Sequence, residues 1–317
     1  MEGRNLLSVN RRAQRIVEEM VRREEELKIR VKKLGNGATV IDAGVEVPGS
    51  VEAGIAFSEI CMGGLGKVEV RVERIPWVFV RTDFPLISCM ASQYAGWAVK
   101  VEKYFAMGSG PARALARVEK LFEELGYKDE SEVAVLTLET RKLPDERVAE
   151  VVAQRCGVKP ENLTLVVAPT ASLVGSIQIS ARVVETGVHK LHEVGFPLQK
   201  IVSGLGKAPI APVAKNDLEA MGKTNDCVLY GGRTVYFVEA EDEEVERVIE
   251  QVPSSSSRDY GVPFLELFER YQRDFFKIDP KLFSPAEIFV NNLKTGRVFH
   301  AGKINEEVLE KSLGLRP

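Results

Sequence analysis

The chain has 317 residues, of which 44% are hydrophobic and 28% are charged, and its formal net charge is −3. This length suffices for two ordinary domains or one large one, and the composition is that of a globular protein. The near balance of 43 basic and 46 acidic residues excludes a strongly basic protein that binds nucleic acid or an anionic membrane surface.

The four cysteines, Cys61, Cys89, Cys156 and Cys227, are far apart in the chain and form no CxxC motif. We interpret them as reduced, mostly buried thiols and expect no metal site. No apolar run approaches the roughly 20 residues of a membrane span. Residues 1–12 also lack the apolar core of a signal peptide. We therefore expect a cytoplasmic protein with no membrane and no nucleic-acid partner.

The N-terminal part of the chain predicts alternating helices and strands. Residues 9–31 place apolar side chains at helical spacing among charges, and Asn10 is suited to cap the start of this helix. A short strand is predicted at 38–42, a helix at 52–62 and a strand at 67–80.

The middle of the chain carries the clearest pattern. Residues 85–107 are apolar and rich in small residues, and 111–125 predict a helix that stops at Gly126. Two buried strands then alternate with two helices, at 133–138, 145–156, 163–167 and 171–194. This alternation predicts an α/β structure with at least one parallel crossover.

The C-terminal part reads as more irregular. Residues 204–212 are rich in Gly and Pro and predict a loop, and 254–257 resemble a surface linker or mobile loop. The remaining predicted elements are a strand-rich stretch at 228–240, a helix at 264–276, a hairpin at 287–300 that turns at Thr295-Gly296, and a terminal helix capped by Asn305. This mixed connectivity argues against a pure doubly wound sheet.

Gly108-Ser109-Gly110-Pro111 precedes the predicted helix at 111–125. A helix start with free amides and a positive dipole end binds anions, so the motif predicts a phosphate or carboxylate site. An ordinary capped helix explains the same residues equally well. A dinucleotide fingerprint is a weaker alternative, because Arg113 replaces its third glycine, although Glu139 lies roughly where an acidic ribose ligand is expected. A dinucleotide-dependent oxidoreductase is therefore a rival hypothesis.

The helix predicted at 171–194 has two stripes. Its apolar stripe consists of Leu173, Ile177, Ala181, Val184, Val188 and Leu191, which indicates packing on a core. The second stripe, about 100° round the helix, consists of Arg182, Glu185, His189 and His192. This second stripe lies at the edge of the core-facing side of the helix, where a ligand cleft can form. The simpler interpretation is that the stripe is an ordinary face at the boundary with solvent. The two histidines lack a third ligand nearby in sequence, so a metal site is not expected.

Two further stretches carry polar groups. Glu139 follows the strand predicted at 133–138, and the carboxyl ends of strands line the ligand crevice in α/β proteins. It can therefore converge with the helix that bears Glu185, or lie in an exposed loop. Thr224, Asn225 and Asp226 belong to a polar, loop-like segment and can bind a heterocycle or simply form a turn.

Several stretches together resemble methenyltetrahydromethanopterin cyclohydrolases. They read TDFP (82–85), SCMASQYAGW (88–97), MGSGPARAL (107–115), QISARVVE (178–185), HKL (189–191), APIAP (208–212) and GKTND (222–226). The resemblance runs from Val9 to the C-terminal region, and its motifs are long and unusual.

The resemblance implies a reaction and an architecture. The reaction is the reversible hydrolysis of methenyltetrahydromethanopterin to formyltetrahydromethanopterin in one-carbon metabolism. The implied structure is two α/β domains around a pocket, in a fold of its own kind, assembled as a homotrimer without a metal or organic cofactor. We expect domains at about 1–127 and 128–317, with segments exchanged between them.

The resemblance also implies residue roles. Glu185 acts as base and then acid, Arg182 orients it, and Glu139 is a second carboxylate that stabilises the cation or binds the pterin. The expected substrate-binding residues are Gly108, Ser109, Gly110, Ser92, Gln93, Thr224, Asn225 and Asp226. A non-enzymatic binding protein for a pterin or phosphate is the other rival, because it keeps the pocket without needing Glu185.

Overall fold

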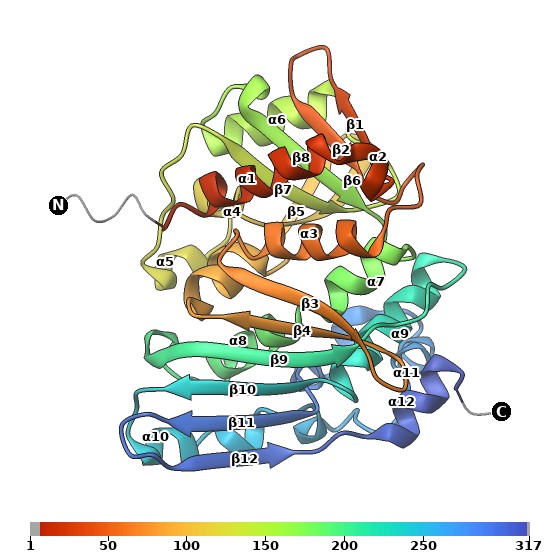
Figure 1. Ribbon diagram of the computed structural model, residues 1–317. Helices are drawn as coiled ribbons and strands as arrows, with labels where there is room; N and C mark the ends of the chain where they lie inside the picture. The colour runs from red at the N-terminus through yellow and green to blue at the C-terminus, as the bar shows by residue number, and fades with distance from the viewer. Residues whose placement is uncertain (1–6, 316–317) are drawn as a thin grey trace. The chain divides into compact units, whose positions relative to one another are not determined.

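A computed structural model of the chain describes residues 7–315 (Figure 1). It contains two compact units, each built on a mixed six-stranded sheet. The first unit extends to Lys67 and resumes at Ile87–Gln178, and the second consists of Val68–Leu86 and the chain from Ile179 onward. Residues 127 and 128, where we expected one domain to give way to the next, both lie inside the first unit.

The sheet of the first unit is parallel at its centre and antiparallel at its edges. Its strands are, in order across the sheet, β1 (Arg30–Lys33), β2 (Thr39–Asp42), β8 (Leu163–Ala168), β7 (Ala134–Glu139), β6 (Tyr104–Ser109) and β5 (Trp97–Val101). The pairs β2/β8 and β8/β7 are parallel, whereas β1, β6 and β5 pair antiparallel with their neighbours. The predicted α/β class with mixed connectivity is confirmed.

Both faces of this sheet are buried. Alternate residues of the central strands enter different cores, because successive strand side chains point to opposite faces. Leu136 and Leu165 join a cluster with the helix at residues 146–156, while Val135 and Val166 join a cluster with the helices at residues 9–22 and 51–61. This explains why β7 and β8 are apolar at almost every position, with Thr137 and Thr164 as polar residues within them.

Helices and turns complete the first unit. They are α1 (Val9–Arg22), α2 (Glu24–Leu27), α3 (Val51–Cys61), the π-helix η2 (Leu86–Gln93), α4 (Arg113–Ala116), α5 (Leu121–Leu125), α6 (Glu146–Cys156), the 3₁₀ turn η3 (Pro160–Asn162) and most of α7 (Leu173–Ser180). The four cysteines are free and buried, as expected. No helix within residues 7–315 is long and apolar enough to cross a membrane.

Asn10 ties α1 to the sheet. Its amide nitrogen donates to the carbonyl of Pro111 at 2.9 Å and to the carboxylate of Asp129 at 2.7 Å, and its carbonyl accepts from the amide of Val135 at 3.0 Å. The side chain is fully buried. The predicted capping role of Asn10 is wrong, because Ser8 caps α1 by accepting from the amide of Arg11.

We predict that Asn10→Ala lowers the free energy of unfolding by about 2–4 kcal/mol. The truncation leaves a buried amide, carbonyl and carboxylate each short of one partner, and each such loss costs about 1–3 kcal/mol before relaxation. Urea unfolding measures the change. Asn36→Ala is the matched control, because the side chain of Asn36 also bonds the backbone, at the carbonyl of Glu146 and the amide of Ala38, but is half-buried rather than fully buried. Equal losses for the two variants would contradict the assignment.

The second unit has its own mixed sheet. Its strands are, in order, β12 (Val298–Gly302), β11 (Glu287–Asn292), β10 (Arg233–Val238), β9 (Ile201–Pro209), β4 (Pro76–Thr82) and β3 (Gly66–Val72). The pair β10/β11 is parallel, whereas β4/β9, β9/β10 and β11/β12 are antiparallel.

The helices of the second unit lie on one face and at one end of the sheet (Figure 1). They are α8 (Val183–Glu193), α9 (Asp217–Leu229), α10 (Asp242–Glu246), α11 (Phe264–Arg270) and α12 (Glu306–Leu313). Short 3₁₀ turns connect them at η4 (Leu198–Lys200), η5 (Ile249–Gln251), η6 (Ser254–Ser256), η7 (Phe275–Lys277) and η8 (Pro280–Leu282). The predicted hairpin and the Asn305 cap of the terminal helix are confirmed.

Several predicted boundaries are wrong. The helix expected at 9–31 ends at Arg22, and its last residues form α2 and β1. The strand expected at 67–80 is a hairpin, β3 and β4, and the helix expected at 264–276 stops at Arg270. The helix expected at 111–125 is two short pieces, because Arg117 adopts a left-handed conformation between them.

Three irregular segments of the prediction are in fact ordered. Most of the loop expected at 204–212 belongs to β9, and the loop expected at 221–226 lies inside α9. The linker expected at 254–257 is a 3₁₀ turn, in which buried Ser254 donates to the carbonyl of Leu229. The helix expected at 171–194 breaks between Ser180 and Val183 into α7 and α8.

Candidate active site

Glu139 terminates β7 in the first unit, as the sequence predicts. One carboxylate oxygen accepts from the hydroxyl of Thr170 at 2.5 Å, and the other accepts from the amide nitrogen of Gln178 at 3.2 Å. Thr170 follows the neighbouring parallel strand β8, and Gln178 lies near the end of α7. Two hydrogen-bond donors therefore hold this carboxylate at the carboxyl edge of the parallel strands, where ligands bind in α/β proteins.

The Gly108–Gly110 segment is not the start of a long helix. Gly108 and Ser109 end β6, and the helix that follows, α4, has four residues. The amide of Gly110 donates to the carbonyl of Ser92, and that of Ala112 to the carbonyl of Val135. These amides are already used, so the free-amide basis of the predicted anion site is wrong, although a substrate contact from these residues stays a prediction.

The dinucleotide alternative also lacks its geometry at this segment. That fingerprint joins a strand to a helix within a parallel βαβ unit. Here β6 runs antiparallel to β7.

Ser92 and Gln93 end the π-helix η2 and are completely buried. The hydroxyl of Ser92 donates to the carbonyl of Cys61 at 2.6 Å, and that of Ser109 donates to the carbonyl of Gln93 at 2.6 Å. The buried Arg113 donates to the carbonyl of Ser92 at 2.9 Å and forms an ion pair with Glu119. This network fixes the π-helix, and such helices occur frequently at functional sites.

Arg182 and Glu185 lie at the start of α8 in the second unit. Arg182 occupies the N-cap position, and its carbonyl accepts from both the amide and the hydroxyl of Thr186. Glu185 follows in the first turn and is only 6% exposed. The positive end of the helix dipole favours a negative charge in this turn.

The position of Glu185 depends on very close packing between α8 and the sheet. The hydroxyl of Tyr236 on β10 donates to the carbonyl of Val184 at 2.7 Å. A Cβ atom on Gly187 would lie 2.1 Å from that hydroxyl, and one on Gly204 would lie 2.9 Å from the side chain of Val184. The first turn of α8 is therefore fixed by contacts that tolerate no larger residues.

The other members of the predicted stripe lie at the boundary of α8. His189 and His192 are half-buried, and His189 lies 3.9 Å from Glu193. Burial lowers the pKa of His189, which favours its neutral form. Within residues 7–315, no group of three or more His, Cys, Asp or Glu side chains is arranged to hold a metal ion.

Thr224, Asn225 and Asp226 lie on α9 rather than in a loop. Consecutive helical residues point about 100° apart, so the three side chains do not share one face. Thr224 is buried and donates to the carbonyl of Ala220, and Asn225 is half-buried and donates to the carbonyl of Met221.

Asp226 caps a neighbouring helix. Its carboxylate accepts from the amide of Phe264 at the start of α11, at 2.9 Å, and from the hydroxyl of Ser312 on α12, at 2.5 Å. Burial raises the pKa of this carboxyl from 3.8 to about 7, although both hydrogen bonds act in the opposite direction. The side chain thus joins three helices of the second unit.

We predict that the contribution of Asp226 to the free energy of unfolding falls as the pH rises from about 4 to about 7. In this window the folded state binds a proton at Asp226 that the unfolded state has released, so rising pH favours unfolding, by up to about 4 kcal/mol in total. Asp226→Asn has no titration and should remove this loss; its amide oxygen can still accept from the amide of Phe264, and its amide nitrogen can donate to the hydroxyl of Ser312, which then accepts. Urea unfolding across the pH range measures it.

The alternative outcomes are distinct. If Asp226 binds substrate, Asp226→Asn should raise KM while the two proteins keep the same dependence of stability on pH. An unchanged KM with a flattened stability profile would instead assign Asp226 to the packing of α9, α11 and α12.

Sequence reasoning missed the residues that support the two carboxylates. Thr170 holds Glu139 from the next strand, and Tyr236 holds the turn that bears Glu185. Thr170 had a usable signal, because it follows a buried strand just as Glu139 does. No sequence signal marked Tyr236, since its position in the sequence is that of an ordinary core residue of β10.

Comparison with known proteins gives one result over nearly the whole chain. A family described as "Cyclohydrolase (MCH)" matches residues 8–313. The methenyltetrahydromethanopterin cyclohydrolase of Methanocaldococcus jannaschii is 52% identical, over 98% of this chain and 99% of its own length. The proteins of that name from Methanothermobacter marburgensis and Methanococcoides burtonii are 51% and 48% identical, each over 98% of this chain, and over 100% and 99% of their own lengths.

Proposed function

The chain belongs to the methenyltetrahydromethanopterin cyclohydrolase family, and from this premise we propose that Glu185 is the base and then the acid of the reaction. The enzyme is a hydrolase, and the substrate is a methenyl derivative of a tetrahydromethanopterin-type pterin. The observation that carries the residue assignment is a nearly buried carboxylate, 6% exposed, in a first helical turn that the sheet fixes by direct contact.

The methenyl carbon lies between two ring nitrogens and carries delocalised positive charge. Water attacks it, and the attacking water must lose a proton, which the carboxylate of Glu185 accepts. The product of this step is a hydroxylated tetrahedral adduct and a protonated Glu185.

The adduct then collapses to the formyl product. One carbon–nitrogen bond breaks, the leaving nitrogen takes the proton from Glu185, and the hydroxyl proton departs as the carbonyl forms. The overall reaction consumes one water and releases one proton, and Glu185 returns to its starting state. A buried site serves both steps, because electrostatic interactions are stronger where water is excluded.

Arg182 and Glu139 take supporting roles in this proposal. Arg182 lies one helical turn before Glu185, at the spacing of neighbouring side chains, and orients the carboxylate and the attacking water. Glu139 supplies a second negative charge that stabilises the cationic substrate, and its two hydrogen bonds keep it in place.

In this proposal only some of the predicted substrate-binding residues contact the substrate. Asn225 is the preferred contact to the heterocycle, because its side chain is half-buried and its carbonyl oxygen accepts no hydrogen bond from the residues at 7–315. Ser92, Gln93 and the Gly108–Gly110 segment act by shaping the π-helix. We further propose a cytoplasmic homotrimer, in line with the resemblance.

We predict that Glu185→Gln lowers kcat by roughly 10²–10⁴-fold, the usual contribution of a positioned acid or base. The amide keeps the shape of the carboxyl but accepts no proton. Loss of the methenyl-pterin absorbance after addition of purified protein measures the rate, and thermal unfolding checks that the variant is folded.

Glu139→Gln is the matched control, and we expect a smaller loss because Glu139 transfers no proton in this scheme. A full rate in Glu185→Gln with a large loss in Glu139→Gln would move the acid–base role to Glu139. Absence of turnover by folded wild-type protein would overturn the reaction itself and favour a binding protein.

A further inference from the structure

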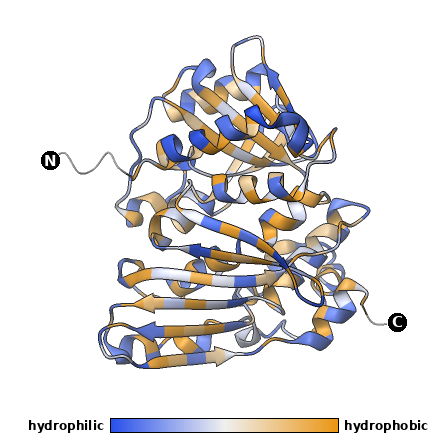
Figure 2. Ribbon diagram, viewed as in Figure 1, coloured by the Kyte–Doolittle hydropathy of each residue, from blue (hydrophilic) through white to orange (hydrophobic). Residues whose placement is uncertain are grey.

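The strands β7 and β8 end at a topological switch point of the first sheet. They are parallel neighbours, but the chain leaves them toward opposite faces of the sheet. The connection after β7 leads to α6, on the face of Leu136, whereas the connection after β8 leads to α7, whose Val174 lies on the face of Val135. Figure 2 shows the hydrophobic residues of these strands. Ligands of open α/β sheets bind at such a point, which is where Glu139 lies.

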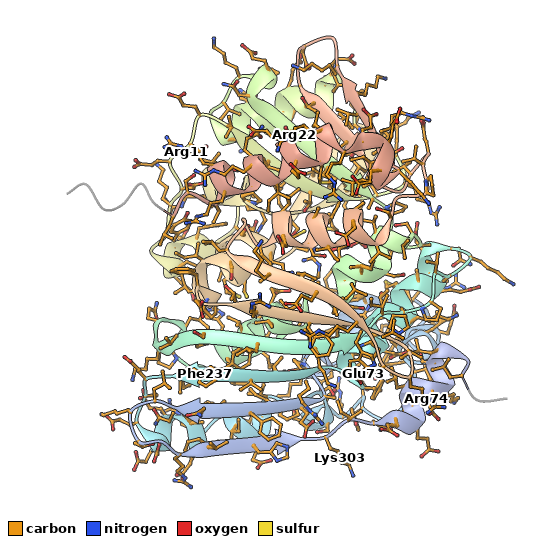
Figure 3. All side chains as sticks on the ribbon, in the orientation of Figure 1. Arg11, Arg22, Glu73, Arg74, Phe237 and Lys303 are labelled. Carbon is orange, nitrogen blue, oxygen red and sulfur yellow. The ribbon has the colours of Figure 1, made fainter. Side chains whose placement is uncertain are left out.

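Glu139 is held differently from the carboxylates at the surface of this unit. Arg22, which Figure 3 marks on α1, pairs with Glu19, and the two side chains are 66% and 48% exposed. Glu139 is half-buried and accepts instead from Thr170 and Gln178, which are 8% and 1% exposed. These donors are neutral, so they fix the carboxylate and leave its negative charge for a cationic ligand.

Close packing of α7 fixes the helix that carries Gln178. A Cβ atom on Gly175 would lie 2.2 Å from the carbonyl oxygen of Pro169. One on Gly54 of α3 would lie 2.8 Å from the side chain of Ile177. Because both contacts depend on the absence of a side chain, α7 has little room to shift within the first unit.

Gln178 also lies where the chain passes from one unit to the other. The first unit ends at this residue. Two residues later, the hydroxyl of buried Ser180 donates to the carbonyl of Pro209, at the end of β9 in the second unit, at 2.7 Å. The helix α8 follows directly, with Glu185 in its first turn. Two side chains, two residues apart, thus attach the chain to one unit and then to the other just before the turn that carries Glu185.

We propose that Gln178 is a positioning residue that couples the two carboxylates of the reaction. Its hydrogen bond to Glu139 fixes the end of α7, and the short segment to Ser180 transmits this position to the turn that bears Glu185. Loss of the bond therefore displaces the acid–base group and also loosens Glu139. The inference rests on the roles proposed above for Glu139 and Glu185.

Gln178→Met tests the coupling, because it removes the hydrogen bond and keeps the charge of Glu139. We expect kcat to fall by roughly five- to fiftyfold, below the roughly hundredfold that a displacement of about 1 Å can cost, and KM to rise. Glu139→Gln removes the charge instead, and a pair of amides can keep the bond after one amide turns over. It should raise KM and leave kcat close to that of the wild type.

The exchange of Glu139→Gln together with Gln178→Glu reverses donor and acceptor. The amide at position 139 can accept from Thr170 and donate to the carboxylate at position 178, so the bond is kept. We expect kcat close to that of the wild type. Ile177→Val is the matched control, because it trims a buried side chain of the same helix without changing the bond. Loss of the methenyl-pterin absorbance at several substrate concentrations gives kcat and KM, and thermal unfolding checks the fold.

A fall in kcat for Gln178→Met that the exchange restores, with normal kcat in Ile177→Val, would support the coupling. Unchanged kcat in Gln178→Met would overturn it, whether or not KM rises. An equal fall in Ile177→Val, or a folded exchange variant as slow as Gln178→Met, would also overturn it and assign the effect to the packing of α7. If the exchange variant does not fold, Gln178→Met and Ile177→Val decide the result. Full kcat in Glu185→Gln is a separate outcome that would overturn the proposed function.

Discussion

The arrangement of the second unit depends on three glycines at the contact between α8 and the sheet. Gly204 and Gly206 on β9 leave room for Val183 and Val184, and Gly187 leaves room for the hydroxyl of Tyr236. The helix can then lie close enough for Tyr236 to donate to a carbonyl of its first turn. Glu185 receives its position from this contact, so the geometry of the proposed acid–base group is set by the packing of α8 on the sheet.

The first unit holds its carboxylate in a different way. Glu139 is fixed by direct hydrogen bonds from Thr170 and Gln178, which come from the next strand and the next helix. Here the backbone topology brings Thr170 next to Glu139, because the parallel neighbours β7 and β8 end at the same edge of the sheet. Hydrogen bonds to its own oxygens hold the carboxylate of Glu139, whereas the packing of α8 on the sheet positions the carboxylate of Glu185.

The sequence predicts the environment of Glu139 well and that of Glu185 poorly. The strands at 133–138 and 163–167 were recognisable because both faces of β7 and β8 are buried, and the position of Glu139 followed from that. The break between α7 and α8 was not, because residues 179–182 contain neither Gly nor Pro and the apolar period continues through them. Only tertiary packing separates the two helices.

Two wrong predictions, at Gly204–Gly206 and at Asp226, have a physical reason. Gly204 and Gly206 serve a close helix contact, yet glycines near Pro209 read locally as a loop. Asp226 reads as a turn residue because its partners Phe264 and Ser312 are 38 and 86 residues away in sequence. The family resemblance supplied the roles of Arg182 and Glu185, which spacing alone did not distinguish from a solvated helix edge.

The order in which the chain enters the two units has a consequence for its synthesis. The β3–β4 hairpin leaves the ribosome long before β9, the strand with which β4 pairs. At roughly 5–20 residues per second, the edge of β4 waits on the order of ten seconds without its neighbour, while the first unit can already fold. During that interval the hairpin presents an open strand edge and apolar side chains such as Val78 and Val80, so we expect it to be prone to aggregation in the nascent chain until β9 is made.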